Sequence, residues 1–152
     1  MGFDRTRKDF WIRIASAILA VVGIGITTYL VYERFSGGLP TCVIGGGCST
    51  VQKSEWSTVA GVPVALMGLL AYIALLVCAL TPWQISVLGA FFVSLLGVLL
   101  SSWLTALELF QIHAICEWCV SSALVVVVAF GFSIARLVIF QREASQRPPA
   151  AS

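Results

Sequence analysis

Residues 116–135 read CEWCVSSALVVVVAFGFSIA, and this stretch decides the fold of the chain. It opens with a C-x-x-C motif, Cys116 to Cys119, and continues to Ala135 without another charged residue after Glu117. An apolar run of this length is long enough to cross the hydrocarbon core of a bilayer as a helix, which takes about 20 residues. The sequence therefore predicts a pair of redox-capable cysteines at the mouth of a membrane-spanning helix.

Three more uncharged stretches lie upstream of this motif. They cover residues 14–32, 62–80 and 85–107, and the fourth stretch extends to residue 140 if Arg136 snorkels to the interface. Apolar residues make up 59% of the 152-residue chain and charged residues only 11%. A soluble domain carries roughly 25% charged residues. The sequence thus predicts an all-α membrane protein, a bundle of four transmembrane helices with a short half-helix and loop between the first two.

The placement of the basic residues predicts the orientation. Lys and Arg gather before the first span and after the fourth, whereas the region between the first two spans holds only Arg34 and Lys53. By the positive-inside rule both termini are cytoplasmic, and both cysteine pairs lie on the exported face. We expect a cytoplasmic N-terminal tail at 1–13, a membrane domain at 14–140 and a disordered cytoplasmic tail at 141–152. The net charge of +2 does not suggest nucleic-acid binding.

The C-x-x-C spacing suits a reversible disulfide within one helical turn. A thiol near a helix N-terminus has its pKa lowered by the helix dipole, and thiol–disulfide exchange requires the thiolate. Taken alone, the motif is also compatible with a structural pair.

A second pair, Cys42 and Cys48, encloses five residues, three of them glycine. Such a flexible loop suits a shuttle that must meet two partners. Ser49 and Gln52 have the spacing of a capping box, which predicts a short helix on the membrane surface just after Cys48. Four cysteines are also a ligand set for structural zinc. The five-residue spacing and an oxidising face both fit zinc poorly, so we expect no metal.

The order of these features resembles the bacterial branch of the vitamin K epoxide reductase family. The resemblance rests on the C-x5-C loop after helix one, Ser54 six residues past Cys48, Gly-x-Pro at 61–63 opening helix two, and C-x-x-C at the mouth of helix four. It covers about residues 14–140. Many bacterial members carry a fused thioredoxin-like domain, whereas this chain ends soon after helix four, so we expect a stand-alone form. The disulfide-forming protein DsbB is the alternative, but there the C-x-x-C pair comes first.

The resemblance implies an enzyme of the cytoplasmic (inner) membrane that oxidises thiols and reduces a quinone, such as menaquinone or ubiquinone, or a quinone epoxide. Cys42 would exchange electrons with a separate DsbA-like thioredoxin-fold partner. Cys48 would pass them to Cys116, and Cys119 would reduce the quinone. Animal members have an aromatic residue where this chain has Ala123, which argues against vitamin K epoxide itself.

A quinone pocket is expected near these cysteines. Ser54, Trp56, His113 and Trp118 are its candidate residues, together with Trp103. Tryptophans are also ordinary interfacial anchors. A histidine at a helix end is a proton relay on one interpretation and an ordinary interfacial residue on the other.

Three remaining polar or reactive residues receive simpler interpretations. Cys78 is expected to be a buried small hydrophobe. Glu108 and Gln111, which close the third span, are expected to face water. A transporter is disfavoured because the spans contain no internal acid or base. A non-enzymatic membrane protein with structural disulfides remains an alternative.

Overall fold

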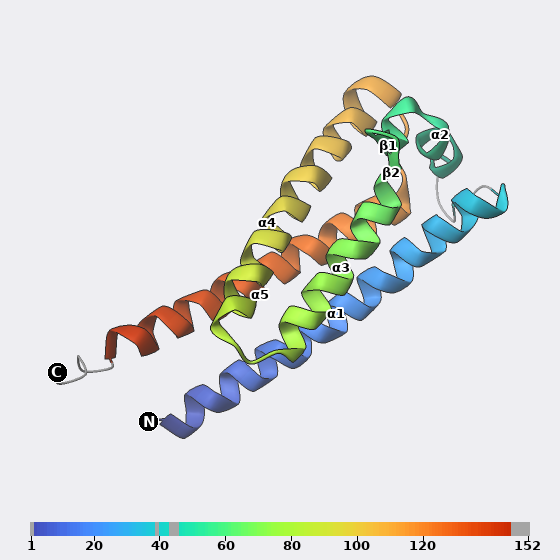
Figure 1. Ribbon diagram of the computed structural model, residues 1–152. Coiled ribbons are helices and arrows are strands. Elements are labelled where there is room, and N and C mark those ends of the chain that lie inside the picture. The colour runs from blue at the N-terminus through green and yellow to red at the C-terminus, as the bar shows by residue number, and fades with distance from the viewer. Residues whose placement is uncertain (1, 39, 43–45, 147–152) are drawn as a thin grey trace.

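The computed structural model describes residues 2–38, 40–42 and 46–146. Its long helices lie side by side in an elongated bundle (Figure 1). The beginning of α1 and the end of α5 lie at one end, which we call the terminal end, and the short elements lie at the other, which we call the cysteine end. The long helices are α1 (Gly2–Ser36), α3 (Val64–Leu80), α4 (Gln84–Leu107) and α5 (Glu117–Gln146).

The short elements all belong to the cysteine end. They are α2 (Cys48–Lys53), the 3-10 turn η1 (Glu55–Ser57), the strands β1 (Thr58–Val59) and β2 (Val62–Pro63), and the π turn η2 (Glu108–Ile112) that extends α4. The two strands pair antiparallel around Ala60 and Gly61, whose φ angles are 51° and 82°. Positive φ at both central residues is typical of the tight turns that suit strand twist.

This hairpin corrects the predicted start of the second span. We expected a helix from residue 62, but residues 62 and 63 form β2 and the helix begins at Val64.

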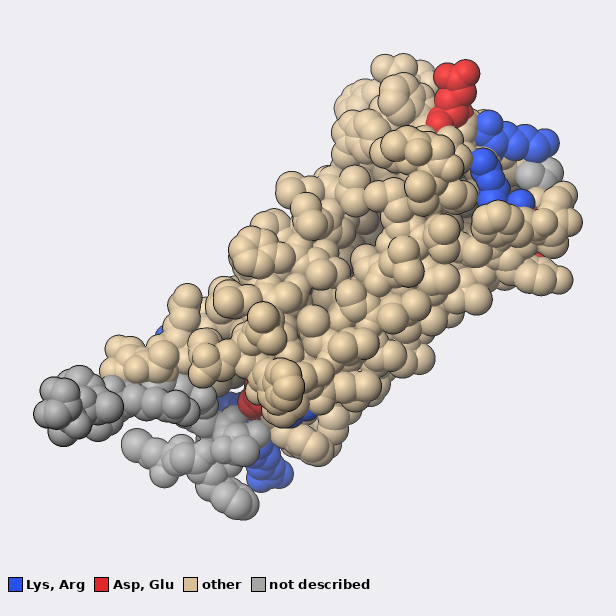
Figure 2. Space-filling model, in the orientation of Figure 1, with Lys and Arg blue, Asp and Glu red and all other residues tan. Residues whose placement is uncertain are grey.

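Three helical segments are long and apolar enough to cross a membrane: Arg7–Ser36, Gln84–Ile112 and Glu117–Arg142. Helix α3 is apolar too, but its 17 residues give a length of about 25 Å, short of a hydrocarbon core of roughly 30 Å. On the face shown in Figure 2, charged side chains gather towards the two ends and the middle is uncharged. The prediction of an all-α membrane protein is therefore confirmed, while the fourth span is not established by length alone.

The helices pack through small residues and one buried ring. Tyr72 of α3 is 3% exposed and forms the core of the bundle with Leu75 and with alanines of α1, α4 and α5. A Cβ atom at Gly23 would collide with the Tyr72 ring, so this glycine allows α1 and α3 to approach. Close approach over small residues is the usual means by which membrane helices associate.

The disorder predicted for the C-terminal tail is wrong in part, while the cytoplasmic placement of both tails stays a prediction. Helix α1 begins at Gly2, so most of the segment predicted as an N-terminal tail continues the first helix. Helix α5 continues to Gln146, and residues 141–146 are helical rather than disordered. The remainder of the predicted C-terminal tail, 147–152, lies outside the described residues.

Arg136 also differs from expectation. It is 4% exposed and donates to the Asp9 carboxylate and to the carbonyl of Cys78, each at 3.3 Å, instead of snorkelling outward. Cys78 itself is a free, half-buried thiol packed against the core, as expected for a small hydrophobe.

The short helix after the first cysteine pair is confirmed, but not its predicted cap. Helix α2 begins at Cys48, and Gly47 is its N-cap residue, with no capping bond from a side chain. The proposed pairing of Ser49 with Gln52 therefore does not start this helix.

Candidate active site

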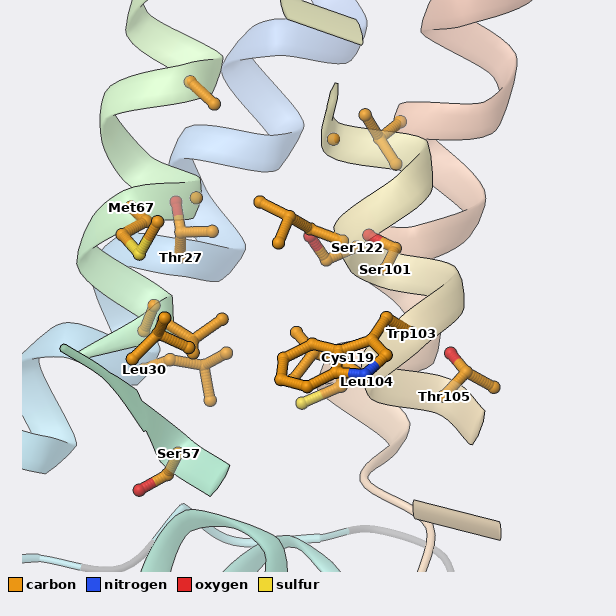
Figure 3. Close-up of a pocket in the computed structure, with 18 of the residues that line it drawn as sticks. Thr27, Leu30, Ser57, Met67, Ser101, Trp103, Leu104, Thr105, Cys119 and Ser122 are labelled. Carbon is orange, nitrogen blue, oxygen red and sulfur yellow. The ribbon is translucent and has the colours of Figure 1, made fainter. Parts of the chain in front are cut away.

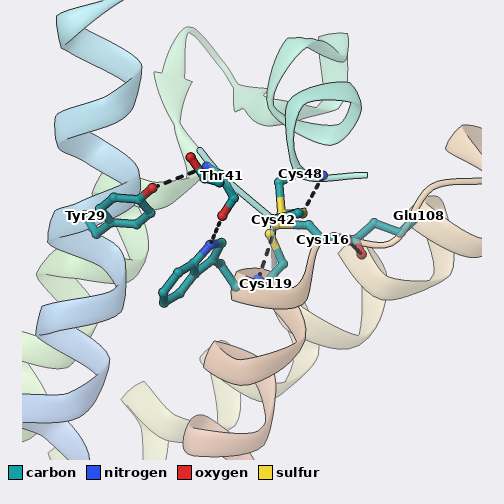
Figure 4. Close-up of a disulfide and its surroundings, with 8 residues drawn as sticks. Tyr29, Thr41, Cys42, Cys48, Glu108, Cys116 and Cys119 are labelled. Atoms are coloured by element: carbon teal, nitrogen blue, oxygen red, sulfur yellow. Dashed lines mark hydrogen bonds between the residues drawn. A yellow bond between two sulfur atoms is a disulfide. The ribbon is translucent and has the colours of Figure 1, made fainter. Parts of the chain in front are cut away.

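The four paired cysteines meet at the cysteine end of the bundle (Figure 4). Cys42 and Cys48 are joined as a disulfide, whereas Cys116 and Cys119 are free thiols. Cys48 and Cys116 are both fully buried and belong to one packed cluster, with Cys42 and Cys119 on its border. Segments far apart in the sequence thus bring the two pairs into one site, with one pair oxidised and the other reduced.

A glycine allows this approach. The backbone at Gly47 lies against Ile115, and a Cβ atom there would collide with the Ile115 carbonyl. Since Gly47 precedes Cys48 and Ile115 precedes Cys116, the contact sets the two buried cysteines against each other. Residues 43–45 of the loop between Cys42 and Cys48 lie outside the described residues, so the flexibility of this loop remains a prediction.

Trp118 fastens the loop that carries Cys42. Its indole N–H donates to the carbonyl of Thr41 at 3.1 Å, and its ring packs on Tyr29 of α1 at 5.0 Å between centroids. The Thr41 amide in turn donates to the Tyr29 hydroxyl at 3.3 Å. The segment before Cys42 is therefore held between α1 and the first turn of α5.

The helix start of α5 favours a thiolate at Cys116. Cys116 lies one residue before α5, and its sulfur accepts the backbone N–H of Cys119 at 3.4 Å. The pKa of Cys116 is lowered, first by a hydrogen bond from the Cys119 thiol and then by the amides of Cys119 and Trp118, against the opposing effects of burial and of Glu108. A lowered pKa at this position was predicted, but the neighbouring thiol contributes more than the helix terminus.

A cavity of about 470 Å³ lies beside the second cysteine pair (Figure 3). Helices α3 and α4 form most of its apolar wall, and Cys119 lies on that wall while Cys116 does not. Trp56 and Trp103 meet edge to face across its rim, with ring centroids 6.0 Å apart. Cavities of this size and character hold small apolar ligands with an aromatic or polar head.

The structure divides the predicted pocket residues into two groups. Ser54 and Trp56 line the cavity, together with Trp103, and the Ser54 hydroxyl donates to the carbonyl of Val51 at 2.6 Å. Trp118 and His113 line no part of it. Trp118 instead holds the Cys42 loop, as described above.

His113 shapes the backbone. It is exposed and adopts a left-handed conformation with φ of 54°, which ends the η2 turn ahead of Cys116. Its side chain does not line the cavity that it was predicted to serve.

Glu108 is the residue that sequence reasoning placed wrongly. It was expected to face water, but it is 3% exposed, whereas Gln111 is exposed as expected. The Glu108 carboxylate accepts the backbone N–H of Cys116 at 3.2 Å and is a hydrogen-bonding partner of the Cys119 thiol. It also lines the cavity. The sequence did carry one signal for this residue, because Glu108 is the single acid at the end of an otherwise uncharged apolar span.

One group of possible metal ligands occurs in the described part of the chain. The sulfurs of Cys42 and Cys48 and the Glu117 carboxylate lie within 4.8 Å of one another. A cysteine binds metal as a thiolate, and neither sulfur offers one while the disulfide is closed. The expectation that no metal binds stays a prediction.

A comparison with protein-family models gives one match. The model of the vitamin K epoxide reductase family matches residues 14–134, well over half of the chain. The chain belongs to the vitamin K epoxide reductase family. The match begins within α1 and ends within α5, so it includes both cysteine pairs and the cavity.

Family membership sets the broad chemistry. Members are membrane thiol–disulfide oxidoreductases that use a quinone and work with thioredoxin-like partners. This decides against the alternative of a DsbB-like protein reached by convergence. Such a reaction needs cysteine pairs that exchange electrons and an apolar site for the quinone. This structure has one oxidised and one reduced pair beside an apolar cavity.

Proposed function

We propose that this protein is a thiol:quinone oxidoreductase that reoxidises a separate thioredoxin-fold protein and thereby supports disulfide formation. One observation supports the proposal above all others, namely the order of burial along the sulfurs. Cys42 is half-buried, Cys48 and Cys116 are fully buried against each other, and Cys119 lies on the wall of the cavity. Electrons entering at Cys42 have a packed route to a ligand in the cavity.

The proposed relay moves two electrons by two exchanges. A reduced partner attacks the Cys42–Cys48 disulfide at Cys42, the more accessible sulfur, and resolution of the mixed disulfide releases the oxidised partner. Freed Cys48 attacks Cys116 in a Cys116–Cys119 disulfide. The Cys42–Cys48 bond then closes again and leaves the second pair reduced, which is the combination seen in the structure.

Quinone reduction completes the cycle at Cys119. The second pair gives up two electrons as the Cys116–Cys119 bond forms, and the quinone takes those electrons with two protons to become quinol. The apolar cavity suits a quinone ring, with Trp56 and Trp103 at the rim and Cys119 on the wall. Menaquinone and ubiquinone share this head-group chemistry, whereas a quinone epoxide would take the same two electrons and two protons to become a quinone and water.

The membrane arrangement belongs to the same proposal. Helix α3 lies between α1 and α4 and is the fourth span, with local thinning or tilt matching its shorter length. The cysteine end then faces the exported side, where an oxidising compartment supplies thiol partners. Both ends of the described chain lie at the terminal end and so face the cytoplasm (Figure 1).

The direct experiment is anaerobic reduction of a soluble short-chain quinone by the purified full chain with a dithiol donor. Replacing Cys119 by Ser should lower the rate by more than about 10³-fold, because the route to the cavity is cut. Replacing Cys78 by Ser provides a matched control, since Cys78 is also a half-buried thiol but lies at the terminal end. The Cys78 variant should keep the wild-type rate.

A second comparison tests the direction of the relay. Cys42→Ser should remove activity with a thioredoxin-fold donor and keep it with a small dithiol that can reach the second pair. Wild-type turnover by Cys119→Ser, or equal loss with both donors in Cys42→Ser, would contradict the proposed order.

A further inference from the structure

The acid at the end of α4 has an unusual environment. Glu108 is 3% exposed, and its carboxylate accepts the N–H of Cys116 at 3.2 Å and shares the single thiol proton of Cys119 with the Cys116 sulfur. Among the described residues Glu108 forms no ion pair; the salt bridge found there joins Arg136 and Asp9. A buried carboxylate without a cation is costly, and such groups are expected to serve a function.

The backbone fixes this side chain in place. Glu108 begins the η2 π turn, and its carbonyl accepts the N–H groups of His113 and of Ala114, the latter at 3.3 Å. The turn therefore folds the chain back so that Cys116 can donate to the carboxylate eight residues earlier. Single π turns inserted at the end of an α-helix occur frequently at functional sites.

The carboxylate joins the reacting sulfurs to the cavity. Glu108 and Cys119 both line it, and Figure 4 shows both side chains beside Cys116. Quinone reduction needs protons as well as electrons. Of the two ionisable side chains besides Cys119 that line the cavity, the Tyr72 hydroxyl donates to the carbonyl of Ser122, whereas Glu108 is hydrogen-bonded to the Cys119 thiol.

We propose that Glu108 is a catalytic residue that takes the proton from the Cys119 thiol and delivers it to the quinone. This inference rests on the proposed function.

The step balances when Cys116 begins as thiolate. The Cys119 proton moves to the Glu108 carboxylate, and the bond between the two sulfurs forms as two electrons leave for the quinone. Glu108 then protonates one quinone oxygen and returns to carboxylate, while water supplies the second proton. One thiolate, one thiol, one quinone and one proton become one disulfide and one quinol.

Other ionisable groups near Glu108 define what a pH experiment can report. Cys116 and Cys119 face it from the start of α5, where Glu117 is the next charged residue. His113 follows it on its own turn and is exposed. Helix α2, which packs against η2, carries Lys53, which is exposed, and Cys48, which is a thiol once the first pair is reduced.

The test compares Glu108→Gln, Glu108→Asp and Glu55→Gln in the full chain. Glutamine keeps an oxygen for the Cys116 N–H but cannot take a proton, and aspartate keeps the carboxylate on a shorter side chain. Glu55 is an exposed acid at the same end and does not line the cavity, so Glu55→Gln is the matched control. The pre-reduced proteins are mixed anaerobically with a soluble short-chain quinone across a range of pH.

Glu108→Gln should react about 10²-fold more slowly at neutral pH, the usual size of a lost acid–base catalyst. Its rate should climb with pH, because hydroxide then removes the Cys119 proton. Glu108→Asp should recover part of the rate, and Glu55→Gln all of it. A wild-type rate in Glu108→Gln, or a loss that is equal at every pH and not relieved by Asp, would overturn the proposal.

A second measurement needs no quinone, so it tests the role of Glu108 independently of the proposed quinone reduction. The thiolate absorbance of the reduced pair is titrated in wild type and in Glu108→Gln. Because the Glu108 charge raises the pKa of Cys116, its removal should move the Cys116 titration to lower pH. If wild type fails to reduce any quinone, the proposed function falls. An unshifted titration overturns the link between Glu108 and the sulfurs in either case.

Discussion

Among the described residues, each end of the bundle buries one acidic or basic side chain, and the two are held in different ways. At the terminal end Arg136 is 4% exposed and pairs with Asp9, while Arg13 donates to the carbonyls of Ala79 and Leu80 that end α3. At the cysteine end Glu108 is equally buried, but its partners are a backbone amide and a thiol.

The difference indicates that the charge of Arg136 has a structural role and the charge of Glu108 a role in the reaction. Arg136 meets an opposite charge and a helix carbonyl, so its contacts close the terminal end. Glu108 meets the residues that change oxidation state, and a cavity of about 470 Å³ lies beside it. Substitutions at the terminal end should therefore change stability, and substitutions at the cysteine end should change turnover.

The largest expected effect concerns the contact between the cysteine pairs. Gly47→Ala places a methyl group against the Ile115 carbonyl and pushes Cys48 away from Cys116. A displacement of about 1 Å can slow a positioned reaction by roughly 10²-fold. Exchange between the pairs, followed by rapid acid quench and mass spectrometry, should slow by that factor.

Gly25→Ala is the control for this substitution, since a Cβ atom at Gly25 meets nothing within 4 Å. Equal exchange rates in the two alanine variants would show that the Gly47 contact does not position the sulfurs.

A smaller effect, on stability, is expected at the terminal end. Asp9→Asn leaves the buried guanidinium of Arg136 without its carboxylate. Because Asp9 is itself 37% exposed, we expect a loss of about 2 kcal/mol, or roughly 5 °C in Tm, below the range for fully buried pairs. Thermal melting followed by circular dichroism measures it.

Turnover per folded molecule should be unchanged in Asp9→Asn. The control is Arg142→Gln, which removes an exposed cation from the same helix, α5, and should leave Tm within error. A turnover defect in Asp9→Asn would erase the distinction between the two ends.

A tryptophan at each end gives a third, smaller comparison. Trp103 lines the cavity and packs against Trp56, whereas Trp83 is 69% exposed at the start of α4. Trp103→Ala should raise the KM for quinone about tenfold with little change in kcat, since an aromatic contact contributes roughly 1 kcal/mol beyond its buried area. Trp83→Ala should change neither. Steady-state kinetics at varied quinone concentration measure both KM and kcat for each variant.

The smallest effect concerns pH. The Cys119 thiol is the first cause of the lowered pKa of Cys116, so the Cys116 thiolate persists to lower pH than in a free thiol. Cys119→Ala removes the donor and should move the thiolate titration to higher pH, whereas Cys119→Ser keeps a donor and should move it less. Thiolate absorbance against pH measures both. Identical titration curves would show that Cys119 does not lower the pKa of Cys116.

Much of the fold was predictable because hydropathy is a local property. The apolar runs located the long helices, and the positions of Cys116 and Cys119 located the start of α5. The hairpin at 58–63 was not predicted, since strands of two residues give no periodic signal. The helical end of α5 was missed because its polar composition suggested disorder, although Arg, Glu and Ala at 142–144 are good helix formers.

The cysteines of the site could be predicted from the sequence, but the role of Glu108 could not. Spacing identified both cysteine pairs, but the burial of Glu108 depends on the π turn and on the amide of Cys116, eight residues away. Trp118 and His113 were assigned to the pocket by nearness in sequence to Cys116. A helix start points successive side chains in different directions, so nearness in sequence does not decide which residues share a cavity.

The central claim is that electrons pass from the first cysteine pair to the second through Cys48 and Cys116. The most direct measurement uses the double variant Cys42→Ser/Cys119→Ser, in which each pair keeps only its buried member. After mild oxidation and peptide mass spectrometry, we predict a disulfide between Cys48 and Cys116, with Cys78 still free. Recovery of Cys48 and Cys116 as free thiols, under conditions that close the Cys42–Cys48 bond in wild type, would contradict the relay.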